Sequence, residues 1–215
     1  MDVITDFYDV QSKQWPSYGR HILAYFDEKS ILVYQAYRPS IGHFVIKHGC
    51  FGGPDYSFSR MSWIKTNFLW MMYRSGWGTK GDQETILALR LSRSFFDSIL
   101  ESAVPSTYDP ELFSDHNAWK EAVEASDVRL QWDPDHSPSG TKLERRAIQL
   151  GLRGAILKAY ASKEILDVID LTDFVASQRP YATSGVGLRI PVEHVYKPRS
   201  IKARERVRID EMDGG

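Results

Sequence analysis

Two polar residues at the end of a predicted strand have the types and the spacing of a catalytic pair. Residues 128–132 are rich in β-branched and apolar side chains, which predict a strand. Gln131 lies near the end of this strand and Asp133 directly follows it. Side chains two positions apart in a strand point to the same face. The amide could therefore orient a substrate while the carboxylate meets positive charge developing on a sugar. Asp133-Pro134 is also a typical start of a turn, so a structural role stays open.

A group of cations among aromatic rings lies between Phe58 and Trp77. Arg60, Lys65 and Arg74 occur there with no acidic residue in the segment. Such cations hold phosphate groups and aromatic faces stack on bases, so the pattern favours a nucleotide or a nucleic acid as ligand. The alternatives are ordinary surface charge and, for tryptophans repeated at every seventh position, one stripe of a buried helix.

The pair Arg145-Arg146 is a third candidate. Apolar residues at helical spacing predict a long helix over 143–160, with Gln149 one turn after Arg145. Two guanidinium groups at the start of a helix could bind phosphate. A solvated helix face explains the same residues equally well.

Several common kinds of site are disfavoured by what the sequence lacks. Cys50 is the single cysteine, and the six histidines form no His-x-His or His-x-x-x-His pair. Asp133, Asp135 and His136 could ligate a metal, but capping or turn roles are favoured, and we expect no metal site. The phosphate-binding Gly-x-x-x-x-Gly-Lys motif, the dinucleotide motif Gly-x-Gly-x-x-Gly and the hydrolase motif Gly-x-Ser-x-Gly are all missing.

Charge is balanced over the 215 residues but segregated along the chain. Of the 27 basic and 28 acidic residues, seven basic and one acidic lie in 29–81, two basic and nine acidic in 101–136, and seven basic and two acidic in 189–209. Such blocks create local potentials that attract anionic ligands. The alternative is that oppositely charged blocks simply face each other in the fold.

Composition also predicts the cellular location of the protein. Its content of 42% hydrophobic and 26% charged residues is typical of a globular protein. The acidic segment 1–6 does not resemble a secretory leader, and the longest uncharged apolar run, 68–73, is too short to span a bilayer. With a single cysteine, we expect an intracellular protein, cytoplasmic or nuclear, without a membrane partner.

The elements that must position these residues predict an α+β fold with a mixed, mostly antiparallel sheet and flanking helices. We expect a single globular domain over 20–178, an N-terminal arm over 1–19 and a basic, extended C-terminal tail over 179–215. Strands are predicted at 31–37, 56–62, 86–91 and 128–132, followed by a short strand or turn from residue 167. Helices are predicted at 39–49, 67–75, 95–100, 118–125 and 143–160, with a last one ending at 175.

These motifs resemble those of a known family, the domain-of-unknown-function family 4291, found in bacteria and scattered eukaryotes. The resemblance covers about residues 18–178 and rests on Val33-Tyr34-Gln35-Ala36-Tyr37, Ser59-Arg60-Met61-Ser62-Trp63-Ile64-Lys65, Trp70-Met71-Met72-Tyr73-Arg74-Ser75-Gly76-Trp77, Gln131-Trp132-Asp133-Pro134, and Arg145 with Ile148-Gln149. The family name implies no function.

A second resemblance, at the level of the fold, is to ADP-ribosyltransferases. It implies that Gln35 holds the ribose of NAD, that Tyr73 stacks on nicotinamide, and that Gln131-x-Asp133 matches a Gln/Glu-x-Glu motif. Such enzymes usually carry Arg or His in place of Gln35, and Asp133 is one methylene shorter than the usual Glu.

The first hypothesis is therefore an NAD-dependent transferase of ADP-ribosyltransferase type, with NAD as co-substrate and possible transfer to nucleic acid. The predicted catalytic residues are Asp133, Gln131 and Arg60. The residues predicted to bind the cofactor are Gln35, Tyr37, Trp63, Lys65, Tyr73 and Arg74. The competing hypothesis is a non-catalytic RNA- or DNA-binding module that uses the same cations and rings. A structural interaction protein, in which the tryptophans are all core, is the third.

Overall fold

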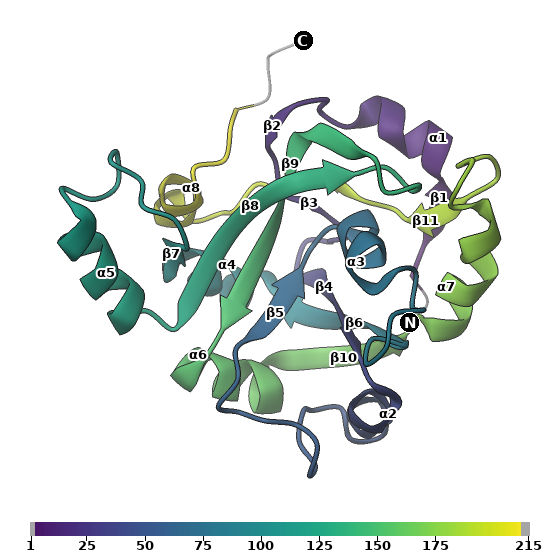
Figure 1. Ribbon diagram of the computed structural model, residues 1–215, viewed down its shortest axis with the longest axis horizontal. Helices are drawn as coiled ribbons and strands as arrows, with labels where there is room; N and C mark the ends of the chain where they lie inside the picture. The colour runs from purple at the N-terminus through teal and green to yellow at the C-terminus, as the bar shows by residue number, and fades with distance from the viewer. Residues whose placement is uncertain (1–2, 212–215) are drawn as a thin grey trace.

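The computed structural model describes residues 3–211, and a mixed, mostly antiparallel eight-stranded sheet lies at its centre (Figure 1). The strands of this sheet are β2 (Gly19–Arg20), β4 (Ser30–Tyr37), β5 (Ser62–Lys65), β6 (Thr85–Ser92), β7 (Ala103–Pro105), β8 (Val128–His136), β9 (Lys142–Leu152) and β10 (Ile165–Asp170). They run in the order β10–β6–β4–β5–β9–β8–β7, and β2 pairs with β9 off this path. Only the pairs β2–β9 and β7–β8 of this described sheet are parallel.

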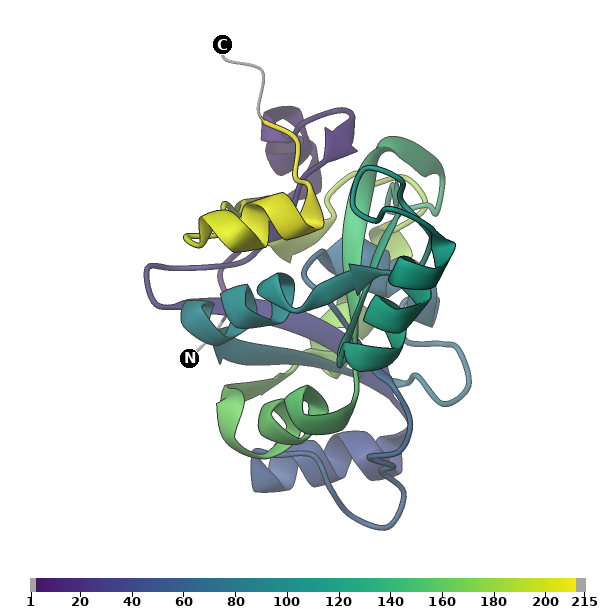
Figure 2. The ribbon, with the colours of Figure 1, turned by 90° about the vertical axis from the view of Figure 1, so that its left-hand side faces the viewer.

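Eight α-helices flank the sheet within residues 3–211, so the expected α+β class is confirmed. They are α1 (Tyr8–Gln11), α2 (Pro39–His48), α3 (Phe68–Ser75), α4 (Arg93–Glu101), α5 (His116–Ala125), α6 (Gly154–Ala159), α7 (Thr172–Gln178) and α8 (Ile201–Val207). In Figure 2, α8 lies directly beside α4, and contacts between the two helices agree with this view. No described helix is long and apolar enough to cross a membrane.

The sheet separates two hydrophobic cores because β4 and β6 are apolar on both faces. Ile31 and Val33 of β4 belong to one core, which α2, α4, α6 and α8 cover. Leu32 and Tyr34 belong to the other core, which α3 and α7 cover. Successive strand residues point to opposite faces, so a continuous apolar run is what a strand covered on both sides needs.

The short helix α3 begins and ends where the sequence predicts. Asn67 caps its start by accepting a hydrogen bond from the Trp70 backbone N–H at 2.7 Å. Gly76 ends it in the left-handed conformation, at φ 57°. The alternative of a buried helix holds for Trp70, which is 5% exposed in α3, but one stripe of three tryptophans does not form, because Trp63 lies on β5 and Trp77 follows the Gly76 stop. α3 is therefore too short to carry all three rings.

The predicted helix over 143–160 is wrong for residues 143–152. Residues 142–152 form β9, and α6 occupies only 154–159. Ile148, Leu150 and Leu152 recur at every second position and are all buried. This period of two competes with the helical spacing in the sequence, and the long pairing with β8 decides it.

Two further strand boundaries differ from prediction. The expected strand over 56–62 is a loop up to residue 61, and β5 starts at Ser62. The expected end of a strand at Trp132 is also wrong, because β8 continues to His136. Asp133 and Pro134 therefore lie within a strand rather than in a turn.

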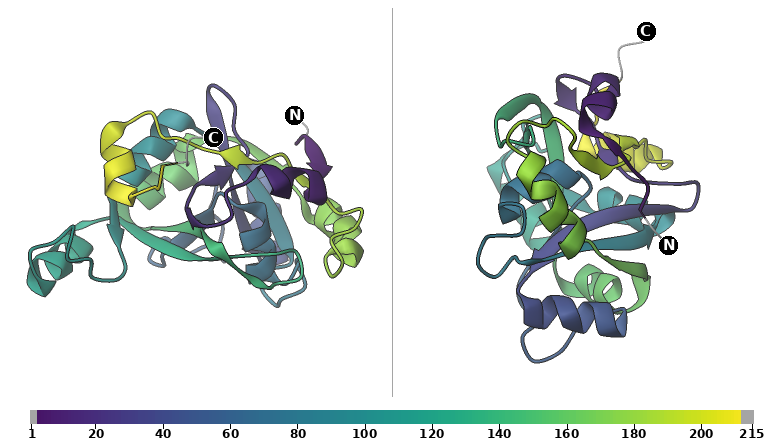
Figure 3. Two further views of the ribbon diagram at one scale, coloured as in Figure 1. Left: turned by 90° about the horizontal axis from the view of Figure 1, so that it is seen from above. Right: turned by 90° about the vertical axis from the view of Figure 1, so that its right-hand side faces the viewer.

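The N-terminal and C-terminal segments pack together on the domain. β1 (Thr5–Phe7) pairs with β11 (Arg189–Pro191), and β3 (Leu23–Ala24) pairs with β12 (His194–Val195), as the view from above in Figure 3 illustrates for the first pair. The expected extended tail over 179–215 is wrong for its described part, because isolated apolar residues within the basic segment, including Leu188, Tyr196 and Val207, are buried in the cores. Residues 1–2 of the expected arm and 212–215 of the expected tail lie outside the described residues.

Candidate functional site

A cavity of about 560 Å³ opens where β4 and β5 separate. The two strands share one paired position, Tyr34 opposite Lys65. Beyond that pair, the cavity is bordered by side chains of β4, β5, α3, β8 and β9 together with the loop before β5. Its lining includes seven of the nine predicted site residues: Gln35, Tyr37, Arg60, Trp63, Lys65, Arg74 and Gln131.

Three neighbouring strands carry a row of polar residues along this cavity. Lys65 of β5 lies opposite Gln149 of β9, and Gln149 lies opposite Gln131 of β8. The Gln149 amide donates hydrogen bonds to Gln131 Oε1 at 2.7 Å and to Asp133 Oδ2 at 2.6 Å. Gln131 and Asp133 thus share a face, as their spacing predicts, and Gln149 fixes both.

A second cavity, of about 410 Å³, meets the first at Gln131. Gln131 and Asp133 both line it, together with the 105–112 loop and part of α8. Its cations are Arg20, Arg206 and Arg208. Arg208 is paired with Asp109, at 2.7 Å, and with Glu111. Gln131 therefore lies between the two cavities, whereas Asp133 lines the second one alone.

The cations of the first cavity divide into two kinds. Arg60 and Arg74 are exposed and make no side-chain hydrogen bond or ion pair with another described residue, which leaves their guanidinium groups free for an anion. Lys65 is 6% exposed, and its Nζ donates to the Trp63 carbonyl at 3.3 Å. Burial, with Arg74 nearby, lowers the pKa of Lys65 to about 7, against a weaker opposite effect of Asp133.

Gln35 supports the cavity wall through hydrogen bonds that occupy its whole amide. Its Nε2 donates to Tyr37 OH, Ser62 Oγ and the Trp63 carbonyl at 2.8–3.1 Å. Its Oε1 accepts from Tyr160 OH at 2.6 Å. With the amide engaged on both sides, Gln35 orients Tyr37 and Ser62, and a direct bond to a ligand would have to displace one of these partners.

Tyr73 is the predicted aromatic residue that does not line the cavity. It is 42% exposed and stacks on His136, with ring centroids 3.6 Å apart, and on Trp70 at 5.4 Å. Its position on α3 places it one residue from Arg74 but on a different side of the helix. Tyr37 and Trp63 are the predicted rings that the cavity does contain.

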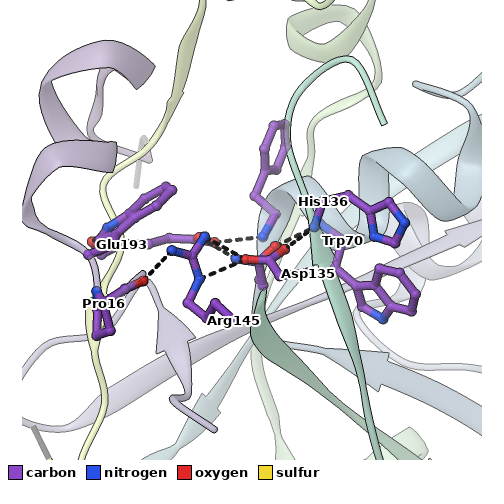
Figure 4. A network of polar contacts seen from close by, with 9 residues as sticks. Pro16, Trp70, Asp135, His136, Arg145 and Glu193 are labelled. Carbon is purple, nitrogen blue, oxygen red and sulfur yellow. Dashed lines mark hydrogen bonds and ion pairs between the residues drawn. The ribbon is translucent and has the colours of Figure 1, made fainter. Parts of the chain in front are cut away.

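Arg145 is committed to a buried network rather than to a ligand (Figure 4). Its Nε and Nη2 donate to Asp135 Oδ2 at 2.9 and 2.6 Å, and its Nη1 donates to the Pro16 carbonyl at 2.6 Å. Glu193 lies beside this pair and accepts from the Phe68 backbone N–H at 2.7 Å. Burial raises the pKa of Glu193 well above its usual value. This network joins both terminal segments to the β8–β9 hairpin.

Two other features are weaker candidates for a functional site. A larger cavity, of about 900 Å³, lies beside α8, but its lining mixes basic and acidic residues: Arg20, Arg204, Arg208, Glu111, Glu205 and Asp210. Within residues 3–211, no group of three or more His, Cys, Asp or Glu side chains could hold a metal ion.

Sequence reasoning missed Ser62 and Tyr160 and assigned Gln149 to a helix. Gln149 could have been found from the alternation of apolar residues that begins at Ile148. Tyr160 has no local signal, because its partner Gln35 is 125 positions away.

The sequence profile of one family matches residues 21–196, which include every residue that lines the first cavity. The description of this family is "Domain of unknown function (DUF4291)". The chain belongs to this family. A search of curated proteins found no match. α8 and its arginines lie beyond the DUF4291 match, so the second cavity is built partly from residues outside it.

Proposed function

We propose that this DUF4291 chain is a transferase that breaks the nicotinamide–ribose bond of NAD and passes ADP-ribose to an acceptor. The observation that supports this proposal most is the position of Gln131 between two cavities, with Asp133 held beside it by the same Gln149 amide. A donor in the cavity with free guanidinium groups and an acceptor in the second cavity would meet at Gln131, next to the Asp133 carboxylate.

The chemistry assigns a role to each side chain. Arg60 and Arg74 would bind the pyrophosphate of NAD, and Trp63 would stack on an aromatic ring of NAD. As the C1′–N bond breaks, its electron pair goes to nicotinamide, and the Asp133 carboxylate stabilises the positive charge left on the ribose. The acceptor then forms a bond to C1′ and loses a proton.

Gln149 is the positioning residue in this proposal. Its amide holds Asp133 Oδ2 and leaves Oδ1 for the sugar. Gln35 would act at a distance, by holding Tyr37 and Ser62 in the cavity wall. These assignments replace the direct ribose contact that the resemblance implies for Gln35.

Release of nicotinamide from NAD tests this function. The wild-type chain should release it, and Asp133→Asn should slow release by about 10²–10³-fold, because one group that stabilises transition-state charge is lost. Asp173→Asn is the matched control, since Asp173 is exposed at the start of α7 and lines neither cavity. Undiminished turnover by Asp133→Asn rejects the assignment.

A second candidate function is binding of single-stranded nucleic acid without catalysis. The free guanidinium groups of Arg60 and Arg74 on one side of Gln131, and Arg20 and Arg206 on the other, favour it. Such binding should weaken steeply with salt and should not depend on the Asp133 carboxylate. Salt-dependent RNA binding by a chain that releases no nicotinamide would favour this function over the first.

A further inference from the structure

Lys65 combines burial, access to a cavity and the lack of a carboxylate partner. It is 6% exposed and lines the first cavity at the point where β4 and β5 separate. Its Nζ makes no ion pair with a described residue, and its one hydrogen bond is to the Trp63 carbonyl. Buried lysines are usually paired with an acid, so this arrangement requires another explanation.

The surroundings of Lys65 favour a neutral amine. Arg74 of α3 and Asp133 of β8 act on its charge, and Tyr34 of β4 and Gln149 of β9 lie opposite it in the sheet. Burial and Arg74 both oppose a charged ammonium, and they outweigh Asp133. A neutral amine keeps a free electron pair and is therefore a nucleophile, whereas an ordinary surface lysine at neutral pH is almost wholly protonated.

The side chains of the cavity around this amine favour a negatively charged ligand. Arg60 and Arg74 line the same cavity with unpaired guanidinium groups, which suit a phosphate. Trp63 offers a ring face in the same lining. A ligand that satisfies all of these groups carries a phosphate at one end and an electrophilic carbon at the other.

We propose that Lys65 is a carbonyl-reactive amine that forms an imine with a phosphate-bearing aldehyde or ketone. The Nζ electron pair attacks the carbonyl carbon, and a proton moves from nitrogen to oxygen to give a carbinolamine. Loss of one water molecule then leaves a C=N bond, so the step needs no oxidant or reductant. This activity needs neither NAD nor Asp133, and it goes beyond the proposed transfer of ADP-ribose.

Trapping with borohydride tests this proposal. The wild-type chain is incubated at pH 7 with pyridoxal 5′-phosphate, used as a phosphate-bearing aromatic aldehyde, and imines are reduced to stable amines. Peptide mass spectrometry then gives the yield at each lysine. We expect Lys65 to be labelled at least about tenfold more than any other lysine of the chain, because so little of an ordinary lysine is neutral at this pH.

Matched variants separate chemistry from folding. Arg60→Gln, at an exposed position, should lower labelling of Lys65 by pyridoxal 5′-phosphate but not by pyridoxal, which has no phosphate. In urea, where the cavity is lost, the selectivity for Lys65 should disappear. Labelling spread over exposed lysines, with Lys65 no more modified than Lys47 or Lys80, overturns the proposal. The labelling is also repeated with excess NAD. If NAD fails to protect Lys65 while selective labelling persists, the result counts against the proposed NAD-dependent function and not against the reactive Lys65 amine.

Discussion

Replacing Lys65 with methionine should change how the stability of the protein depends on pH. The pKa of Lys65 is lowered from 10.5 to about 7 by burial, with Arg74 nearby. Between these two values, the unfolded chain binds a proton at this position and the folded chain does not. The free energy of unfolding therefore rises with pH by about 1.4 kcal/mol per unit in this window.

The size of the effect follows from the length of that window. From pH 7.5 to 9.5, Lys65 should add roughly 3 kcal/mol to the stability of the wild-type chain. Lys65→Met has no amine to titrate and lacks this gain. The variant should therefore be more stable than the wild type at the lower pH, and this advantage should shrink as the pH rises.

Urea unfolding at pH 7.5, 8.5 and 9.5 measures the difference between the two chains. Titrations of other groups cancel in that difference, as long as the substitution leaves their surroundings unchanged. Lys47→Met is the matched control, because Lys47 is exposed near the end of α2 and should leave the pH profile parallel to that of the wild type. If the free energies of unfolding of Lys65→Met and the wild type change in parallel with pH, the inference that the Lys65 amine is neutral is refuted.

Three other predictions concern the surroundings of the site. Glu193→Gln should gain stability relative to the wild type as the pH rises from 5 to 7, measured by urea unfolding. The raised pKa of buried Glu193 makes wild-type stability fall above about pH 4.5, and the variant lacks this carboxyl group. A stability difference that does not change with pH contradicts this. Gly151→Ala places a Cβ against Met61 Sδ and the Trp63 ring in the cavity lining, so thermal unfolding should show a loss of about 1–3 kcal/mol. An unchanged midpoint contradicts the close packing. Burial lowers the pKa of His136, and Tyr73→Ala should expose its ring. An NMR titration should therefore show the pKa of His136 rising toward 6.5, and an unchanged pKa would contradict the stacking.

The parts of the fold that local sequence determines were predictable. Strand β4 starts with the apolar run 31–34 and is rich in β-branched and aromatic residues, and α3 has both an Asn67 cap and a Gly76 stop. Their positions need no knowledge of distant residues. The pairing of Gln131 with Asp133 on one face follows from strand geometry in the same way.

Parts that depend on distant partners could not be predicted. In β9, the residues Ile148 and Leu152 suit a helix and a strand equally, and the pairing with β8 decides between them. Arg145 has the sequence context of a phosphate ligand, but Asp135 and the Pro16 carbonyl engage it in the fold. Lys65 is one more cation in the sequence, and only the fold reveals the burial and the nearby Arg74 that lower its pKa.

The separation of NAD affinity from NAD cleavage tests the central proposal most directly. Binding and single-turnover release of nicotinamide are measured on the same samples, with enzyme in excess. We predict that Asp133→Asn keeps its affinity for NAD within a few-fold but cleaves it about 10²–10³ times more slowly, while Arg60→Gln mainly weakens binding. A wild-type chain that binds NAD without cleaving it, or an Asp133→Asn variant that cleaves it at the wild-type rate, would contradict the account.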